Sequence, residues 1–174
     1  MADGTPWSEP FRLAELRREP VARRLAADAE ARKRIARDLG LDRLDALQAD
    51  LEISPWRDGV QVAGRWTAAY EQTCGVTLEP LPSKIERAFE LRFAPADEGK
   101  VPREIEELVL DPEAEDPPDP LESDRLDLAK LLVEQLALEI DPFPRKPGAV
   151  FTPPEEERPP SPFSVLQDFK APRS

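Results

Sequence analysis

The chain has 174 residues, with 36 acidic and 24 basic side chains, no histidine and one cysteine. Without histidine there is no imidazole base and no histidine metal ligand, and a single thiol excludes an intrachain disulfide and a cysteine-rich zinc site. There is no basic, apolar leader and no run of roughly 20 apolar residues that would cross a membrane, and one cysteine suits a reducing compartment. We therefore expect a cytoplasmic protein without metal, other cofactor or membrane partner.

The stretch between Pro20 and Gly40 allows two interpretations. Its content of Ala, Leu and Arg favours a single helix that begins at Pro20, because these residues have high helix propensity and proline fits the first helical position. Alternatively, residues 21–27 are extended and Asp28 caps a helix over residues 29–39, which ends at Gly40. The residues alone favour neither interpretation decisively.

Alternation of apolar and polar side chains predicts several strands. Proline residues and an Asp-Gly pair separate the three longest of them, which favours an antiparallel meander with one buried and one solvated face. Trp66 and Tyr70 share the face of Val60 and Val62, so they are assigned to the core. The predicted strands are residues 11–16, 47–53, 60–72 and 85–93, with residues 105–110 as a candidate edge strand.

The strongest helical pattern lies between Asp127 and Ile140. The Asp127 carboxylate is suited to cap the first turn, and apolar residues recur over more than half of the helix circumference. Such a helix is expected to be buried on several sides. Asp141 precedes Pro142, and further prolines before Gly148 prevent continuation. The predicted fold class is α+β, an antiparallel meander packed against this long buried C-terminal helix and a shorter N-terminal helix.

A single domain is predicted for residues 11–148. It follows a flexible leader at residues 1–10 and contains an acidic, partly mobile loop at residues 94–124. The proline-rich tail at residues 149–174 is expected to be extended. Three large apolar residues recur at every third position of its segment 161–170, which is predicted to be a short docking motif.

Charge is distributed unevenly along the chain. Residues 12–43 contain ten basic and six acidic side chains, whereas residues 96–127 contain three basic and thirteen acidic ones. The net charge of −12 argues against binding nucleic acid over a broad surface, because such binding depends on cations that displace counterions. Local phosphate contacts are one role for the N-terminal cations, and a solvated charged face is the alternative. These cations are Arg17, Arg18, Arg23, Arg24, Arg32, Lys33, Arg34 and Arg37.

Two further groups of candidate contact residues follow the long strand and the C-terminal helix. Gln72 and Cys74 lie in the segment QTCGVTLEP, where the strand ends. A thiol without a histidine base is more typical of a small buried apolar residue than of a nucleophile. Arg145 and Lys146 follow the helix and suit its dipole, with or without a partner. No catalytic residue is predicted.

Three separated motifs resemble the YceD family of large ribosomal RNA subunit accumulation proteins. They are QTCGVTLEP, RLDLAKLLVEQLALEIDPFPRKPG and SPFSVLQDF. The resemblance spans the chain from about Pro10 to the tail and favours the second interpretation of residues 20–40, because Ala27-Asp28 matches the start of a helix in relatives. Many relatives carry Cys-x-x-Cys at the turn after the long strand. Here Thr77 occupies the second position, so a thiolate metal site is not carried over.

The resemblance implies a non-enzymatic accessory factor for 23S ribosomal RNA accumulation, acting in large-subunit assembly or rRNA processing. Its partner would be a large-subunit precursor, contacted through a basic ribosomal protein, 23S rRNA or both. The acidic segment 96–127 would engage basic protein, and the Arg-rich region 17–37 would touch rRNA. One alternative is an acidic adaptor or chaperone for a basic protein without RNA contact. The least favoured alternative is a carboxylate-metal hydrolase.

Overall fold

The computed structural model describes residues 6–16, 19–95, 117–121 and 123–151. Two helices and a predominantly antiparallel sheet make the fold α+β, as predicted. In chain order the elements are β1 (Pro10–Arg12), the 3₁₀ helix η1 (Leu13–Glu15), β2 (Val21–Ala26), α1 (Ala29–Asp38), β3 (Arg43–Trp56), β4 (Gly59–Thr73), β5 (Pro80–Pro95), β6 (Asp119–Leu121), β7 (Arg125–Asp127) and α2 (Leu128–Glu139).

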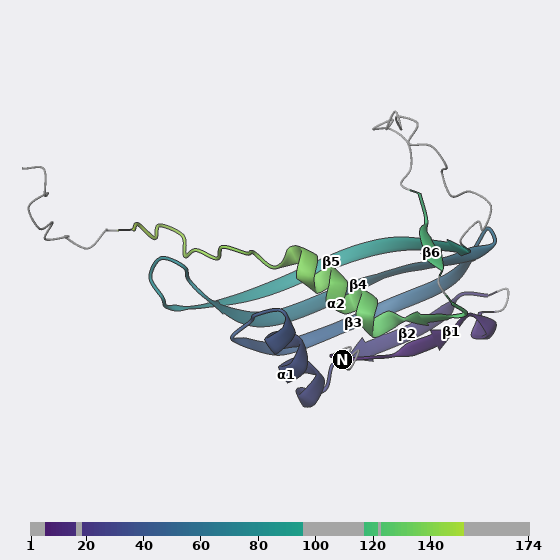
Figure 1. Ribbon diagram of the computed structural model, residues 1–174, viewed down its shortest axis with the longest axis horizontal. Helices are drawn as coiled ribbons and strands as arrows, with labels where there is room; N and C mark the ends of the chain where they lie inside the picture. Colours follow the sequence, from purple (N-terminus) through teal and green to yellow (C-terminus); the bar gives the residue numbers. More distant parts are fainter. Residues whose placement is uncertain (1–5, 17–18, 96–116, 122, 152–174) are drawn as a thin grey trace, which may run out of the picture.

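The main sheet has five strands in the order β2-β3-β4-β5-β6. Strands β2 to β5 are antiparallel neighbours, which confirms the predicted meander, and the short β6 adds to β5 in parallel. Strands β1 and β7 pair separately in a two-stranded sheet. Figure 1 shows the three long strands side by side, with α2 lying across one face of them.

One face of the main sheet is buried and the other is solvated. Ile53, Val62 and Trp66 point to the buried face and are at most 2% exposed. Ile35 from α1 and Leu132 from α2 belong to the same core, so both helices cover this face. Because side chains alternate along a strand, the opposite face carries exposed polar and charged residues. Burial of Trp66 and Tyr70 confirms their assignment to the core.

Helix α1 follows the second interpretation of residues 20–40. Strand β2 is extended, and the Asp28 carboxylate accepts a hydrogen bond of 2.7 Å from the Ala31 amide, as an N-cap does. At the other end Gly40 has a φ of +65°, a left-handed conformation that glycine adopts without steric cost. The Leu41 amide donates back to Ala36 O over 2.8 Å, and the Gly40 amide donates to Arg37 O over 3.4 Å. This pair of bonds is a Schellman motif.

Helix α2 begins as predicted but is buried on one side only. The Asp127 carboxylate accepts from the Ala129 and Lys130 amides, each over 3.1 Å, and also from the Glu9 amide over 2.9 Å. Leu132 is fully buried, whereas Leu138 is 79% exposed. The prediction of burial on several sides is wrong, because the described fold has only two layers and one flank of α2 faces solvent.

The N-terminal segment differs from its prediction. Residues 11–16 were expected to form one strand, but β1 ends at Arg12 and a 3₁₀ turn follows. Trp7, in the stretch predicted to be a flexible leader, is buried in the core. The Glu9 amide also bonds to Asp127, so the described part of the leader packs against the start of α2.

Most of the predicted acidic loop lies outside the described residues, as do the candidate edge strand 105–110 and the docking motif 161–170. Within the described part, β5 continues to Pro95 and residues 119–121 form β6, so these positions are strand and not loop. Strands β6 and β7 have three residues each. Three residues in an acidic, proline-rich context are too few to produce a readable alternation.

Candidate functional site

Two backbone hydrogen bonds close the β4–β5 turn. The Cys74 amide donates to Glu79 O and the Leu78 amide donates to Cys74 O, both over 2.9 Å. Leu78 has a φ of +58°, which few residues with a side chain adopt. Its side chain is 77% exposed. These bonds fix the direction in which the Cys74 side chain and the Gly75 amide point.

The segment that leaves α2 is held against this turn by three hydrogen bonds that involve the backbone or the Cys74 sulfur, and by one between side chains. The Gln72 side-chain amide donates to Asp141 O over 2.9 Å. The Gly75 amide donates to Pro144 O over 2.9 Å, and the Lys146 amide donates to Cys74 Sγ over 3.3 Å. We call residues 72–79 and 141–146 the turn–exit junction. It brings together Gln72, Cys74 and Lys146, which the sequence had placed in two separate groups.

Cys74 is fully buried in the junction, in agreement with the expected small buried residue. Its sulfur accepts hydrogen bonds from Thr77, foremost from the side chain, and from the backbone amides of Lys146 and Val76. These donors favour the thiolate and lower the pKa of Cys74 to about 6, against the effect of burial. The geometry gives the sulfur a structural role, because its acceptor capacity joins the two segments of the junction.

The two cations of the α2 exit have different surroundings. Lys146 Nζ pairs with Glu79 Oε2 at 2.7 Å, which closes the junction on its outer side. The Lys146 side chain lowers the pKa of Glu79, chiefly through this hydrogen bond. Arg145 is exposed and makes no hydrogen bond or ion pair with another described residue. Of the two, Arg145 alone keeps its charge available for a partner.

The cations of α1 also divide into engaged and available side chains. Arg32 donates from Nη1 to Ala27 O over 2.7 Å, and Lys33 pairs with Glu30 at 2.8 Å. The side chains of Arg34 and Arg37 make no hydrogen bond or ion pair with any other described residue. The four predicted contact residues of this helix are therefore not equivalent.

A pocket of about 440 Å³ lies between α1 and the residues that lead into β3. Three of the predicted residues line it, namely Arg32, Lys33 and Arg37, whereas Arg34 does not. Arg43 lines it as well, from the first position of β3. Arg43 was not among the predicted contact residues, because only the backward turn after α1 brings residues 41–45 beside that helix.

The pocket and the turn–exit junction are neighbours at one end of the sheet. The Asp42 amide donates to Glu71 O over 3.0 Å, and the Thr73 hydroxyl donates to Asp42 Oδ2 over 2.8 Å. Asp42 lines the pocket, and Gln72, beside Thr73, holds the α2 exit. In Figure 1 the end of α1 and the exit of α2 accordingly lie toward the same end of the long strands.

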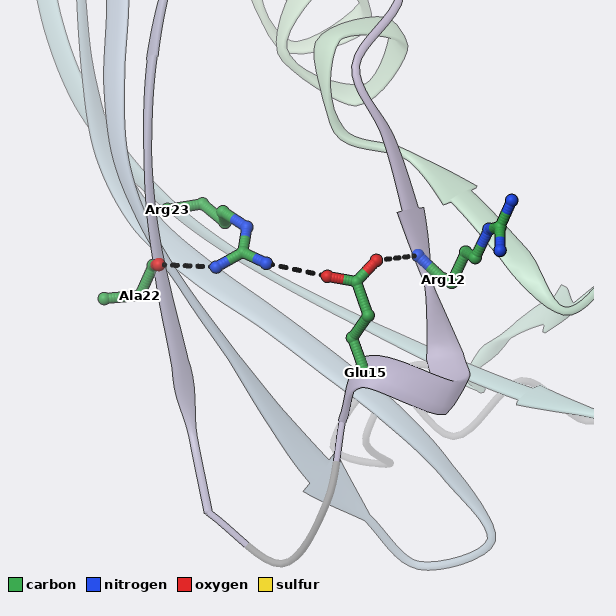
Figure 2. A network of polar contacts seen from close by, with 4 residues as sticks. All are labelled: Arg12, Glu15, Ala22 and Arg23. Carbon is green, nitrogen blue, oxygen red and sulfur yellow. Dashed lines mark hydrogen bonds and ion pairs between the residues drawn. The ribbon is translucent and has the colours of Figure 1, made fainter.

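Two other predicted phosphate contacts are used within the fold. Figure 2 shows Arg23 donating to Glu15 Oε2 over 2.9 Å, while the other oxygen of this carboxylate accepts from the Arg12 amide over 3.3 Å. The same guanidinium lies 5.4 Å from the centre of the Phe11 ring. Arg24 pairs with Asp50 at 3.6 Å on the solvated face. Arg17 and Arg18 lie outside the described residues.

Among the residues that the structure describes, no group of three or more Cys, Asp or Glu side chains is arranged to hold a metal ion. No helix in the described part of the chain has the length and apolar character to span a membrane.

The sequence model of a protein family described as "Large ribosomal RNA subunit accumulation protein YceD" matches residues 62–170. The matched region contains most of β4, all of α2 and the whole turn–exit junction. Helix α1 and its pocket lie before it. No curated protein matches the chain, and no solved structure matches it either.

Proposed function

The chain belongs to the YceD family, and from this membership we propose that it is a non-enzymatic accessory factor for the accumulation of 23S rRNA. It would act in the cytoplasm on large-subunit precursors, in assembly or in rRNA processing. The observation that carries the proposal is the family match, which covers residues 62–170. The absence of histidine from the whole sequence is consistent with a factor that binds and does not catalyse.

We propose that the direct partners are a basic ribosomal protein and 23S rRNA. The acidic segment 96–127 supplies charge complementary to a basic protein, since it contains thirteen acidic and three basic side chains. Basic side chains among those of α1 supply the RNA contact. Helix α1 precedes the residues that match the family model. The proposed RNA contact is therefore supported by the charge and geometry of α1 and not by membership of the family.

Depletion of the protein tests the function. We expect the ratio of 23S to 16S rRNA to fall while both genes are transcribed equally, and expression of the wild-type chain to restore it. Sedimentation of a lysate through a sucrose gradient, with and without ribonuclease, then tests the association with large-subunit precursors. An unchanged rRNA ratio after depletion would overturn the proposed function.

Two charge variants separate the two partners. In the first variant, the segment 111–119 loses its charge through neutralisation of Asp111, Glu113, Glu115, Asp116 and Asp119. It should lose a basic protein partner in a salt-sensitive way. In the second variant, Arg32, Lys33, Arg34 and Arg37 are replaced by Gln, which should weaken RNA association. If only the acidic variant fails to restore the rRNA ratio, the chain is an acidic adaptor without RNA contact.

A further inference from the structure

We propose that the pocket between α1 and residues 41–45 binds a backbone phosphate of single-stranded RNA through Arg37 and Arg32. This inference rests on the proposed function and deepens it, because it selects particular cations of α1 and gives each a role. In the sequence, Arg32, Lys33, Arg34 and Arg37 form one basic group without distinction among its members.

The walls of the pocket are set by the way α1 ends. The Schellman motif at Gly40 sends the chain back toward the helix, so that Leu41 packs beside Ala36. Leu41, Leu44 and Ala36 are at most 7% exposed. They form an apolar floor, because all three line the pocket and carry no polar side-chain atom.

The rim of the pocket is charged, and three of its six charged side chains are held in ion pairs. Lys33 pairs with Glu30 at 2.8 Å. Arg43 pairs with Asp45 at 2.7 Å and more weakly with Glu71 at 3.4 Å. These pairs leave little net charge for a ligand on either residue.

Two guanidinium groups remain without a carboxylate partner. The Arg37 side chain has no hydrogen bond or ion pair within the described residues, and Arg32 uses one nitrogen to donate to the neutral carbonyl of Ala27. That bond holds the Arg32 side chain in place while its other N–H groups stay free. The remaining rim carboxylate, Asp42, accepts a hydrogen bond from the Thr73 hydroxyl. The rim therefore has two uncompensated positive charges against one negative charge.

A phosphate oxyanion fits this arrangement of two guanidinium groups above an apolar floor. Guanidinium groups bind phosphate through paired N–H donors, and an arginine already fixed in place loses less conformational entropy on binding. The apolar floor can cover the sugar or base attached to the phosphate. A volume of about 440 Å³ is in the range of small-ligand sites and suits one nucleotide unit.

The acidity of the whole chain favours a local contact over a broad one. With a net charge of −12, a long duplex laid over the surface would be repelled outside this pocket. A flexible single strand can place one or two phosphates in the pocket and leave its remaining phosphates in solvent. We therefore assign the pocket to single-stranded RNA.

The test compares two single substitutions on the same helix, Arg37→Gln and Arg34→Gln, in the full chain. Both side chains are exposed and make no hydrogen bond or ion pair with a described residue, but only Arg37 lines the pocket. Binding of a labelled twelve-nucleotide oligouridylate is measured by fluorescence anisotropy over a series of potassium chloride concentrations. Arg37→Gln should weaken binding about tenfold, the size of a lost charged hydrogen bond. It should also lower the slope of log affinity against log salt by about 0.7, one single-strand phosphate contact.

Arg34→Gln should bind within about twofold of wild type, because an exposed charge outside the pocket is screened by salt. Circular dichroism melts establish that both variants are folded, and Arg37→Lys, which keeps the charge, should recover part of the lost affinity. Equal losses of RNA affinity for Arg34→Gln and Arg37→Gln would overturn the proposal, because RNA would then bind the basic side chains of α1 without a specific pocket. No RNA binding by wild type would also overturn it.

A second arm uses inorganic phosphate as the probe, with ionic strength matched by potassium chloride. Phosphate that displaces the RNA from wild type supports the site. Phosphate that binds in an Arg37-dependent way while RNA does not bind would overturn the RNA assignment and identify a site for a small phosphate compound. If either experiment rules out the pocket as an RNA site, the ratio of 23S to 16S rRNA after depletion still tests the proposed function independently.

Discussion

The two helices of this protein start alike and end differently. Each begins at an aspartate N-cap and packs on the buried face of the sheet. After helix α1 the chain turns back at Gly40. Arg37, near the end of this helix, lies on the rim of the pocket, and its side chain has no hydrogen bond or ion pair with a described residue. Helix α2 ends before a proline-rich segment whose backbone is hydrogen-bonded to the β4–β5 turn.

The difference shows that the position of a cation at or after the end of a helix does not by itself decide its role. The Lys146 side chain forms an ion pair with Glu79, and the Lys146 backbone amide donates to the Cys74 sulfur. Lys146 therefore stabilises the junction. Arg37 in the last turn of α1 interacts favourably with the helix dipole and keeps its side-chain donors free, whereas α2 has no basic residue in its last turn. The α2 exit is a structural contact, whereas the α1 exit has the unused donors that a ligand needs.

The largest expected effect concerns the one-sided burial of α2. Leu132→Ala should lower the free energy of unfolding by about 2–5 kcal/mol, because the side chain is fully buried and its removal leaves a cavity. Leu138→Ala on the exposed flank should change it by less than about 0.5 kcal/mol. Urea denaturation of both variants measures the difference. Similar losses for the two would mean that the exposed flank of α2 is covered in solution.

The next prediction concerns the backbone turn that ends α1 and its contribution to stability. Gly40→Ala should cost about 1–2 kcal/mol, since an alanine at a φ of +65° is strained although no atom lies close to its Cβ. Gly75→Ala is the matched control in the junction. It has no left-handed φ, and its Cβ would lie 3.7 Å from Pro144 O, an ordinary contact. A Gly40→Ala variant as stable as wild type would show that α1 does not need this turn.

The last prediction concerns the pH dependence of the α2 exit. Folding lowers the pKa of Cys74 from its ordinary value of 9.0 to about 6, chiefly through its hydrogen bonds from Thr77. The resulting stabilisation is complete above pH 9 and is lost as the pH falls through about 6. The stability advantage of wild type over Cys74→Ser should therefore shrink between pH 9 and pH 6. Urea midpoints that change in parallel for the two proteins would contradict this role of the sulfur.

Local features of the fold were predictable from the sequence. Asp127 caps α2 as expected, and the alternation in β3, β4 and β5 gave the meander and the core position of Trp66. These features depend on residues adjacent in the chain or on the two-residue period of a strand, so the sequence carries their signal directly. The start of α1 at Asp28 was one of two local possibilities, and the family resemblance favoured the one that the structure has.

The arrangement of the candidate site depended on tertiary structure. Arg43 joins Arg32 and Arg37 at one pocket only because the chain reverses at Gly40, and Arg34, between them in sequence, points elsewhere. Gln72 and Asp141 are 69 positions apart and meet because α2 crosses the sheet and ends at the β4–β5 turn. No periodicity encodes such a meeting. The sequence by itself determined the three long strands and α2, and the packing of α2 on one face decided which of their ends become neighbours.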